Sequence, residues 1–234
     1  MKETRIKFPC GDLTLEGIST IPEGNGPFPA VVVCHPHPDH GGEMNNNVIV
    51  PICKMLGQAE IASLRFNFRG VGASQGKHAD GIGEKEDVAA ALSYLLTLEA
   101  IDRDRTGLCG YSFGGGVALE VAPADERVKA LALISPDIAT YTPLRQYSRP
   151  KLILCGGSDQ FVSILALQRL AEELPPPNDF EIVAGADHFW GGFELKVATR
   201  VAAFFLKNFQ PPPVQESEEQ QPEIPQPPPE ASPA

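Results

Sequence analysis

Apolar and polar positions alternate at the start of the chain, as they do in strands with one face on a core. Residues 4–8 and 13–21 alternate in this way, and the intervening Pro9-Cys10-Gly11-Asp12 has the composition of a turn. These segments predict an antiparallel hairpin. Residues 30–34 (Ala-Val-Val-Val-Cys) then form an unbroken apolar run, which is typical of a strand covered on both faces.

Downstream of this run, short apolar segments alternate with segments of helical periodicity. We expect strands at 61–66, 106–111, 128–134, 152–155 and 180–183, and helices at 45–58, 84–100, 113–121, 162–174 and 193–209. A hairpin followed by alternating strands and helices predicts an α/β fold with a doubly wound, mostly parallel sheet. No surplus long enough for a cap domain interrupts the pattern. In such sheets, ligands bind beyond the carboxyl ends of the strands.

The alternation stops near residue 210. Residues 211–234 contain nine prolines and five glutamates, and no lysine, arginine or aromatic residue. A segment of this composition cannot bury enough apolar surface to offset its ordering entropy. We therefore expect one folded domain over residues 1–210, followed by a disordered, acidic, proline-rich tail over residues 211–234.

Charge and composition limit the possible partners. The net charge of the chain is −11, of which the tail supplies −5, so a nucleic-acid-binding surface is not expected. Residues 1–5 lead into the first strand without an apolar signal region, and no segment approaches the roughly 18 apolar residues of a membrane span. We expect a cytoplasmic protein without membrane association. Its five cysteines include no CxxC pair and are expected to be reduced packing residues.

Three chemically complementary residues follow strands of the predicted sheet. Ser112 lies in Gly110-Tyr111-Ser112-Phe113-Gly114, between a strand and a helix; Asp159 follows 47 residues later, and His188 a further 29 residues on. A serine in such a turn adopts strained backbone angles that expose its hydroxyl. It becomes a nucleophile when an imidazole accepts its proton and a carboxylate orients that imidazole. The order predicts a catalytic triad of Ser112, Asp159 and His188.

Other residues near these positions compete for the same roles. Asp137, after the strand at 128–134, is an alternative acid, whereas Asp187 is expected to form hydrogen bonds within its loop. Phe189 and Trp190 either line an acyl pocket or pack against the last helix.

One arginine lies near the end of the strand expected at 61–66, and a second follows this strand. Arg65 and Arg69 either bind a substrate carboxylate or tie loops together, and the second use is the commoner one for arginine.

An oxyanion hole needs two backbone N–H donors. One is expected from Phe113, the residue after the nucleophile. The other is expected from the loop after the strand at 30–34, where Pro36 and Pro38 have no N–H and His37 is the best-placed donor.

The same loop also matches a metal-binding pattern. His35, His37, Asp39 and His40 form the HxHxDH motif of metallo-β-lactamase-type hydrolases, and such side chains suit zinc. Against this stand the prolines at both x positions and the short supply of further histidines, which are His78 and His188. The simpler interpretation is that His35 and His40 orient the loop by hydrogen bonding.

Five segments together resemble the α/β-hydrolase superfamily, and within it the small lidless bacterial esterases related to dienelactone hydrolase. The segments are HPHPDHGG at 35–42, RFNFRGVGASQG at 65–76, GYSFGG at 110–115, GSD at 157–159 and GADHFW at 185–190. The resemblance implies Ser112 as nucleophile, Asp159 as acid and His188 as base. Dienelactone hydrolase itself has a cysteine at the position of Ser112.

The expected function is that of a serine hydrolase that cleaves small carboxylic esters through an acyl-enzyme, without a cofactor or metal. Thioesterase or peptidase activity would use the same triad. A zinc hydrolase and a non-catalytic hydrolase fold that serves as an interaction module are further alternatives. The absence of a lid predicts an open site that favours short acyl chains, and the sequence leaves the oligomeric state open.

Overall fold

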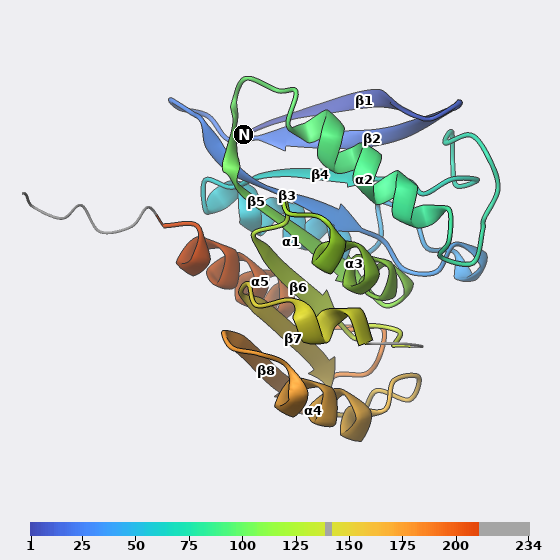
Figure 1. Cartoon of the computed structure of the whole chain (residues 1–234), viewed down its shortest axis with the longest axis vertical. Helices are drawn as coiled ribbons and strands as arrows, with labels where there is room; N and C mark the ends of the chain where they lie inside the picture. The colour runs from blue at the N-terminus through green and yellow to red at the C-terminus, as the bar shows by residue number, and fades with distance from the viewer. Residues whose placement is uncertain (139–141, 211–234) are drawn as a thin grey trace, which may run out of the picture.

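A computed structural model describes residues 1–138 and 142–210 of the chain. Among these residues, eight strands form one sheet in the order β1-β2-β4-β3-β5-β6-β7-β8 (Figure 1). The strands are β1 (Lys2–Cys10), β2 (Leu13–Ile21), β3 (Phe28–Cys34), β4 (Ala62–Phe66), β5 (Ile101–Tyr111), β6 (Ala130–Ile134), β7 (Lys151–Gly156) and β8 (Asn178–Val183).

The sheet is antiparallel at one edge and parallel elsewhere. The β1–β2 hairpin is antiparallel, and β2 also pairs antiparallel with β4. Every other pairing is parallel, from β4 and β3 across to β8. The fold is therefore the predicted α/β architecture with an N-terminal antiparallel hairpin.

Helices cover both faces of the sheet (Figure 1). On one face lie α1 (Ile49–Gln58) and α5 (Glu194–Asn208), and on the other lie α2 (Glu84–Leu95), α3 (Phe113–Ala124) and α4 (Ile164–Glu173). Two short 3-10 helices, η1 (Pro38–His40) and η2 (Thr142–Gln146), lie in connections. No segment between the described elements is long enough to form a cap domain, which agrees with the lidless fold expected from the sequence.

Two separate apolar cores explain why the central strands are apolar throughout. Val31 and Val33 of β3 belong to the core beneath α1 and α5, whereas Val32 belongs to the core beneath α2, α3 and α4. Successive side chains of a strand point to opposite faces, so both faces of β3 are buried. The predicted apolar stripe of α5 also packs on the sheet, and its Val201 and Phe205 are fully buried.

Two element boundaries differ from the sequence prediction. The helix expected over 84–100 ends at Leu95, and β5 begins at Ile101 instead of residue 106. The reason is an extra pairing with β3, in which Phe28 lies opposite Ile101 and its N–H donates to the carbonyl of Ala100 (2.8 Å).

The first helix also begins later than expected, at Ile49. Asn46 does not cap it; its Oδ1 accepts the N–H of Val48 (2.9 Å) and forms a turn before the helix.

Two further expectations concern the described part of the chain. None of its helices combines the length and the apolar character that crossing a membrane requires. All five cysteines are buried and unpaired, as predicted for packing residues.

Candidate active site

Ser112 occupies a strained turn between β5 and α3. Its backbone angles are φ 53° and ψ −120°, a left-handed conformation that costs free energy for a residue with a Cβ. The flanking glycines are required by space, because a Cβ on Gly110 would overlap the carbonyl of Gly114, and one on Gly114 would overlap the carbonyl of His35. The turn therefore packs directly against the end of β3.

The structure brings the three predicted triad residues together at the carboxyl ends of the parallel strands. Ser112 Oγ lies 2.9 Å from His188 Nε2, and His188 Nδ1 lies 3.0 Å from each carboxylate oxygen of Asp159. The Asp159 carboxylate is fully buried, and the His188 side chain is 10% exposed. A hydroxyl, an imidazole and a carboxylate are thus joined in one hydrogen-bonded series.

Several hydrogen bonds hold Asp159 in its ionised form. Burial acts to raise the pKa of this carboxyl, but hydrogen bonds from His188, the Ser135 hydroxyl and the N–H groups of Phe161 and Val162 outweigh it and hold the pKa below its usual range. An ionised Asp159 keeps the proton of His188 on Nδ1, which leaves Nε2 free to accept the Ser112 proton.

Ser135, at the end of β6, is a supporting residue that the sequence analysis missed. Its hydroxyl donates to Asp159 and accepts the Nε1–H of Trp190 (3.2 Å). Tyr111 supports the same loop, since its hydroxyl donates to the carbonyl of His188 (2.8 Å). No local sequence signal identifies Ser135, because its role depends on β6 lying beside β7, the strand that precedes the Asp159 loop.

The alternative acid, Asp137, is not part of this series. Its side chain is exposed, and its backbone N–H donates to the carbonyl of Ser112 (3.0 Å) while Asp159 occupies His188 Nδ1. The structure therefore places Asp159, and not Asp137, beside His188. Asp187 forms the expected loop hydrogen bond, because its Oδ1 accepts the N–H of Phe189 (3.0 Å).

A cavity of about 540 Å³ opens in front of Ser112. Its lining residues are Pro36, His37, His40, Gly41, Gly42, Asn46, Tyr111, Ser112, Phe113, Asp137, Phe161, Val162, His188 and Phe189. Phe161 and Phe189 are 70% and 59% exposed, and their rings pack edge to face with centroids 5.5 Å apart. Of the two aromatic candidates, Phe189 lines this cavity, whereas Trp190 is fully buried in the core beneath α5.

Both expected oxyanion donors belong to residues on the cavity wall. The rings of His37 and Phe113 are in contact, with centroids 5.0 Å apart. Within the described residues, neither backbone N–H donates to a protein acceptor.

His35 fixes the loop that carries His37. Its Nε2 accepts the N–H of Phe68 (3.1 Å), so its Nδ1 carries the proton and donates to the carbonyl of Pro36 (2.7 Å). Burial lowers the pKa of His35 to about 4. His35 is thus a neutral loop anchor, as the simpler interpretation predicted, and neither ring nitrogen is free to bind zinc within an HxHxDH motif.

The other candidate side chains have structural partners. His40 is exposed, and its ring packs on that of His37 with centroids 4.9 Å apart, in place of the expected side-chain hydrogen bond. Arg65 forms an ion pair with Glu3 (3.0 Å), and Arg69 forms one with buried Asp87 (2.8 Å). The arginines therefore tie elements together, and neither lines the cavity in front of Ser112.

Comparison with known proteins identifies the family. The model of the family described as alpha/beta hydrolase fold matches residues 29–145. The chain belongs to the α/β hydrolase family. An uncharacterized protein of Rickettsia prowazekii is 34% identical to this α/β hydrolase over 172 residues, which is 69% of this chain and 72% of that protein.

Two further relatives carry names that describe hydrolases. The structure of an alpha-beta serine hydrolase homologue from Coxiella burnetii superimposes with a TM-score of 0.79 at 31% identity, over 87% of this chain and 97% of that chain. Esterase EstD of Thermotoga maritima is 28% identical over 189 residues, which is 76% of this chain and 45% of EstD. This chain thus spans less than half of EstD. The comparisons support hydrolase activity, and the closer link to dienelactone hydrolase stays a prediction.

Proposed function

We propose that this α/β hydrolase is a serine esterase that cleaves small carboxylic esters through an acyl-enzyme. The observation that carries the proposal is the hydrogen-bonded series from Ser112 Oγ through His188 to Asp159, at the wall of an open cavity. A polarised hydroxyl beside a space for substrate is what nucleophilic attack on a carbonyl requires.

Acylation begins with Ser112. Its Oγ attacks the ester carbonyl carbon while Nε2 of His188 accepts the hydroxyl proton, and the ionised Asp159 stabilises the resulting imidazolium. The tetrahedral intermediate collapses when His188 donates this proton to the leaving alcohol, which departs and leaves the acyl group on Ser112.

The negative charge on the carbonyl oxygen is stabilised by the backbone N–H groups of Phe113 and His37. Phe113 is the first residue of α3, so the positive end of that helix dipole also faces the oxyanion. Removing one such donor typically costs about 3 kcal/mol of transition-state stabilisation.

Deacylation repeats the same steps with water. His188 accepts a proton from a water molecule, the hydroxide attacks the acyl carbon, and the proton then returns to Ser112 Oγ as the acid is released. His188 accepts and then donates each proton that moves in the cycle, so we propose that the reaction needs no cofactor.

The cavity supports a preference for small esters. Its apolar wall comes from Phe113, Phe161, Val162 and Phe189, and no cap domain extends it within the described residues. A long acyl chain would leave most of its length in water, so little additional binding energy is available for it.

A series of p-nitrophenyl esters tests this function. We expect faster turnover of acetate and butyrate esters than of long-chain esters, and a loss of at least ~10³-fold in kcat for Ser112→Ala. The matched control is Ser158→Ala, which changes an exposed serine near the acid loop outside the lining of the cavity. Full activity of Ser112→Ala would contradict the proposed nucleophile, and faster turnover of long-chain esters would contradict the substrate size.

A further inference from the structure

Three potential metal ligands meet beside the cavity of Ser112. His37 lies on the loop after β3, Asp39 lies in η1, and His78 lies on the connection between β4 and α2. One ligand atom of each lies within 4.8 Å of the others. We propose that His37, Asp39 and His78 bind one divalent transition-metal ion of the zinc type.

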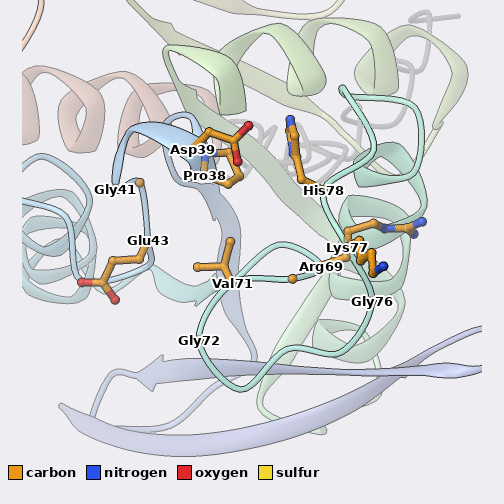
Figure 2. A pocket seen from close by; sticks show the side chains of 12 residues that line it. Pro38, Asp39, Gly41, Glu43, Arg69, Val71, Gly72, Gly76, Lys77 and His78 are labelled. Atoms are coloured by element: carbon orange, nitrogen blue, oxygen red, sulfur yellow. The ribbon is translucent and has the colours of Figure 1, made fainter.

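The side chains face a common space. A pocket of about 530 Å³ adjoins the site and is lined by residues of both connections, Asp39 and His78 among them. Figure 2 shows the Asp39 carboxylate and the His78 imidazole side by side at one end of this pocket. His37 lies outside the lining of this pocket, but its ring is next to that of His78, with centroids 5.0 Å apart, so the two imidazoles can share one ion.

His78 is prepared for coordination by a buried carboxylate. Its Nδ1 lies 3.0 Å from Oε1 of Glu84, whose side chain is fully buried, and neither ring nitrogen of His78 has a well-aligned hydrogen bond among the described residues. Glu84 is itself fixed by the N–H groups of Ala79 (2.8 Å) and Gly81 (2.9 Å). A carboxylate beside one ring nitrogen is the usual second partner of a metal-binding histidine, and the lack of a well-aligned hydrogen bond leaves a nitrogen of His78 available to an ion.

His37 and Asp39 can complete the site with small movements. Nδ1 of His37 accepts the N–H of Asp39 at 3.2 Å, a long hydrogen bond that the ion would replace when it takes the imidazole lone pair. The Asp39 side chain is exposed, so its carboxylate can rotate towards the histidines.

The ligand set matches zinc chemistry. Two imidazoles and one carboxylate are common zinc ligands, with bonds of about 2.0–2.2 Å, and three protein ligands leave a fourth tetrahedral position for water. Asp80 also lies near His78 Nε2 (3.5 Å) and adds negative charge that attracts a cation. The site differs from the HxHxDH motif, because His35 is bound to the backbone and His78 takes part instead.

The experiment uses the full chain after chelator treatment, titrated with ZnCl₂ by calorimetry and with CoCl₂ by visible absorption. We expect one ion per chain and tetrahedral cobalt absorption bands. His78→Ala and Asp39→Asn should each weaken zinc binding by at least about tenfold. His40→Ala is the matched control, because it removes the neighbouring histidine outside the ligand set and should keep the affinity.

A second control separates this site from the proposed triad, whose His188 and Asp159 could also attract zinc. His188→Ala should bind zinc as tightly as the original chain. The proposal is overturned if the original chain shows no saturable binding, if His40→Ala weakens binding as much as His78→Ala, or if His188→Ala alone removes the ion. Should His78→Ala not fold, Asp39→Asn at its exposed position decides the same question.

Discussion

At the scale of single residues, the position and charge of Asp159 depend on a hydroxyl from the neighbouring strand. Ser135 donates to this carboxylate and links it to the indole of Trp190. Its own backbone is strained, with φ 40°. Strained backbone in a buried residue persists only where the surrounding structure holds it in place. For Ser135 those surroundings include the proposed catalytic site.

Ser135→Ala should lower kcat for ester hydrolysis by about 10- to 150-fold, because a hydrogen bond to a charged group contributes roughly 1.5–3 kcal/mol. KM should stay nearly unchanged, since Ser135 does not line the substrate cavity. Steady-state kinetics on a short-chain nitrophenyl ester measures both values.

Ser135→Gly is the control for a merely structural role. Glycine relieves the strain at φ 40° but also lacks the hydroxyl. Ser135→Gly should therefore lose as much kcat as Ser135→Ala while unfolding at a higher temperature than Ser135→Ala. If kcat follows thermal stability across the two variants, Ser135 does not act through Asp159.

His35 makes the stability of the fold depend on pH. Burial lowers its pKa to about 4 in the folded state, against about 6.5 in the unfolded chain, so the unfolded state binds the proton more tightly. Neutral His35 contributes up to about 3 kcal/mol to the free energy of unfolding. This contribution is complete above pH ~6.5 and is lost as the pH falls towards 4. Urea unfolding of the original chain and of His35→Gln at pH 7 and pH 4.5 should show a smaller pH effect in the variant. Parallel pH dependence would contradict the buried neutral histidine.

Some residues of the candidate site could be found from the sequence, and others could not. Ser112, Asp159 and His188 could be found because each follows an apolar strand, and parallel strands bring their carboxyl ends together. Ser135 could not, because its hydroxyl gains a partner only through the adjacency of β6 and β7. For the same reason the sequence left Asp137 open as an acid, since the position of a residue after a strand does not determine where its side chain points.

At the scale of elements, the unit that forms the site is the connection from β5 through Ser112 to α3. Gly114, on the first turn of α3, packs against the carbonyls of Cys34 and His35 at the end of β3. This contact links the proposed nucleophile to the loop that carries the proposed oxyanion donor His37. The sequence predicted this strand, turn and helix, because GxSxG between an apolar run and a helical segment is a local signal.

Gly114→Ala should destabilise the fold by about 1–3 kcal/mol, because the added methyl group overlaps backbone atoms that cannot move freely. Esterase activity should fall with it, since the turn and the β3 loop are pushed apart. Gly191→Ala is the matched control: a Cβ there meets nothing within 4 Å. Thermal unfolding and ester kinetics test the pair, and equal stability of the two variants would refute the close packing.

Element boundaries were harder to predict than element types. Residues 96–100 continue an apolar pattern that suits a helix, yet α2 ends at Leu95 and the chain turns into β5. The deciding interaction is the distant pairing of Ile101 with Phe28, and no window of local sequence contains both residues.

At the scale of the whole molecule, one α/β sheet with helices on both faces accounts for residues 1–138 and 142–210. The last helix, α5, completes one core through buried Phe204 and Phe205, and Phe209 follows it at 3% exposure. Residues 211–234, for which the sequence predicts a disordered tail, lie outside the described residues.

We therefore propose that residues 1–210 fold and act alone. Deletion of residues 211–234 should leave ester kinetics and the unfolding temperature unchanged, because this segment has too little apolar content to form a core. Deletion from Phe204 onwards is the contrasting variant and should not fold, since it removes three buried phenylalanines. A marked loss of stability in the shorter deletion would show that the tail belongs to the folded unit.

The most direct test of the central claim is covalent labelling of the intact protein with a fluorophosphonate, followed by peptide mass spectrometry. If Ser112 is activated by His188 and Asp159, the mass of one label should appear on the peptide that contains Ser112. Labelling should be absent in Ser112→Ala and strongly slowed in His188→Ala. An unlabelled protein, or a label on another residue, would contradict the account.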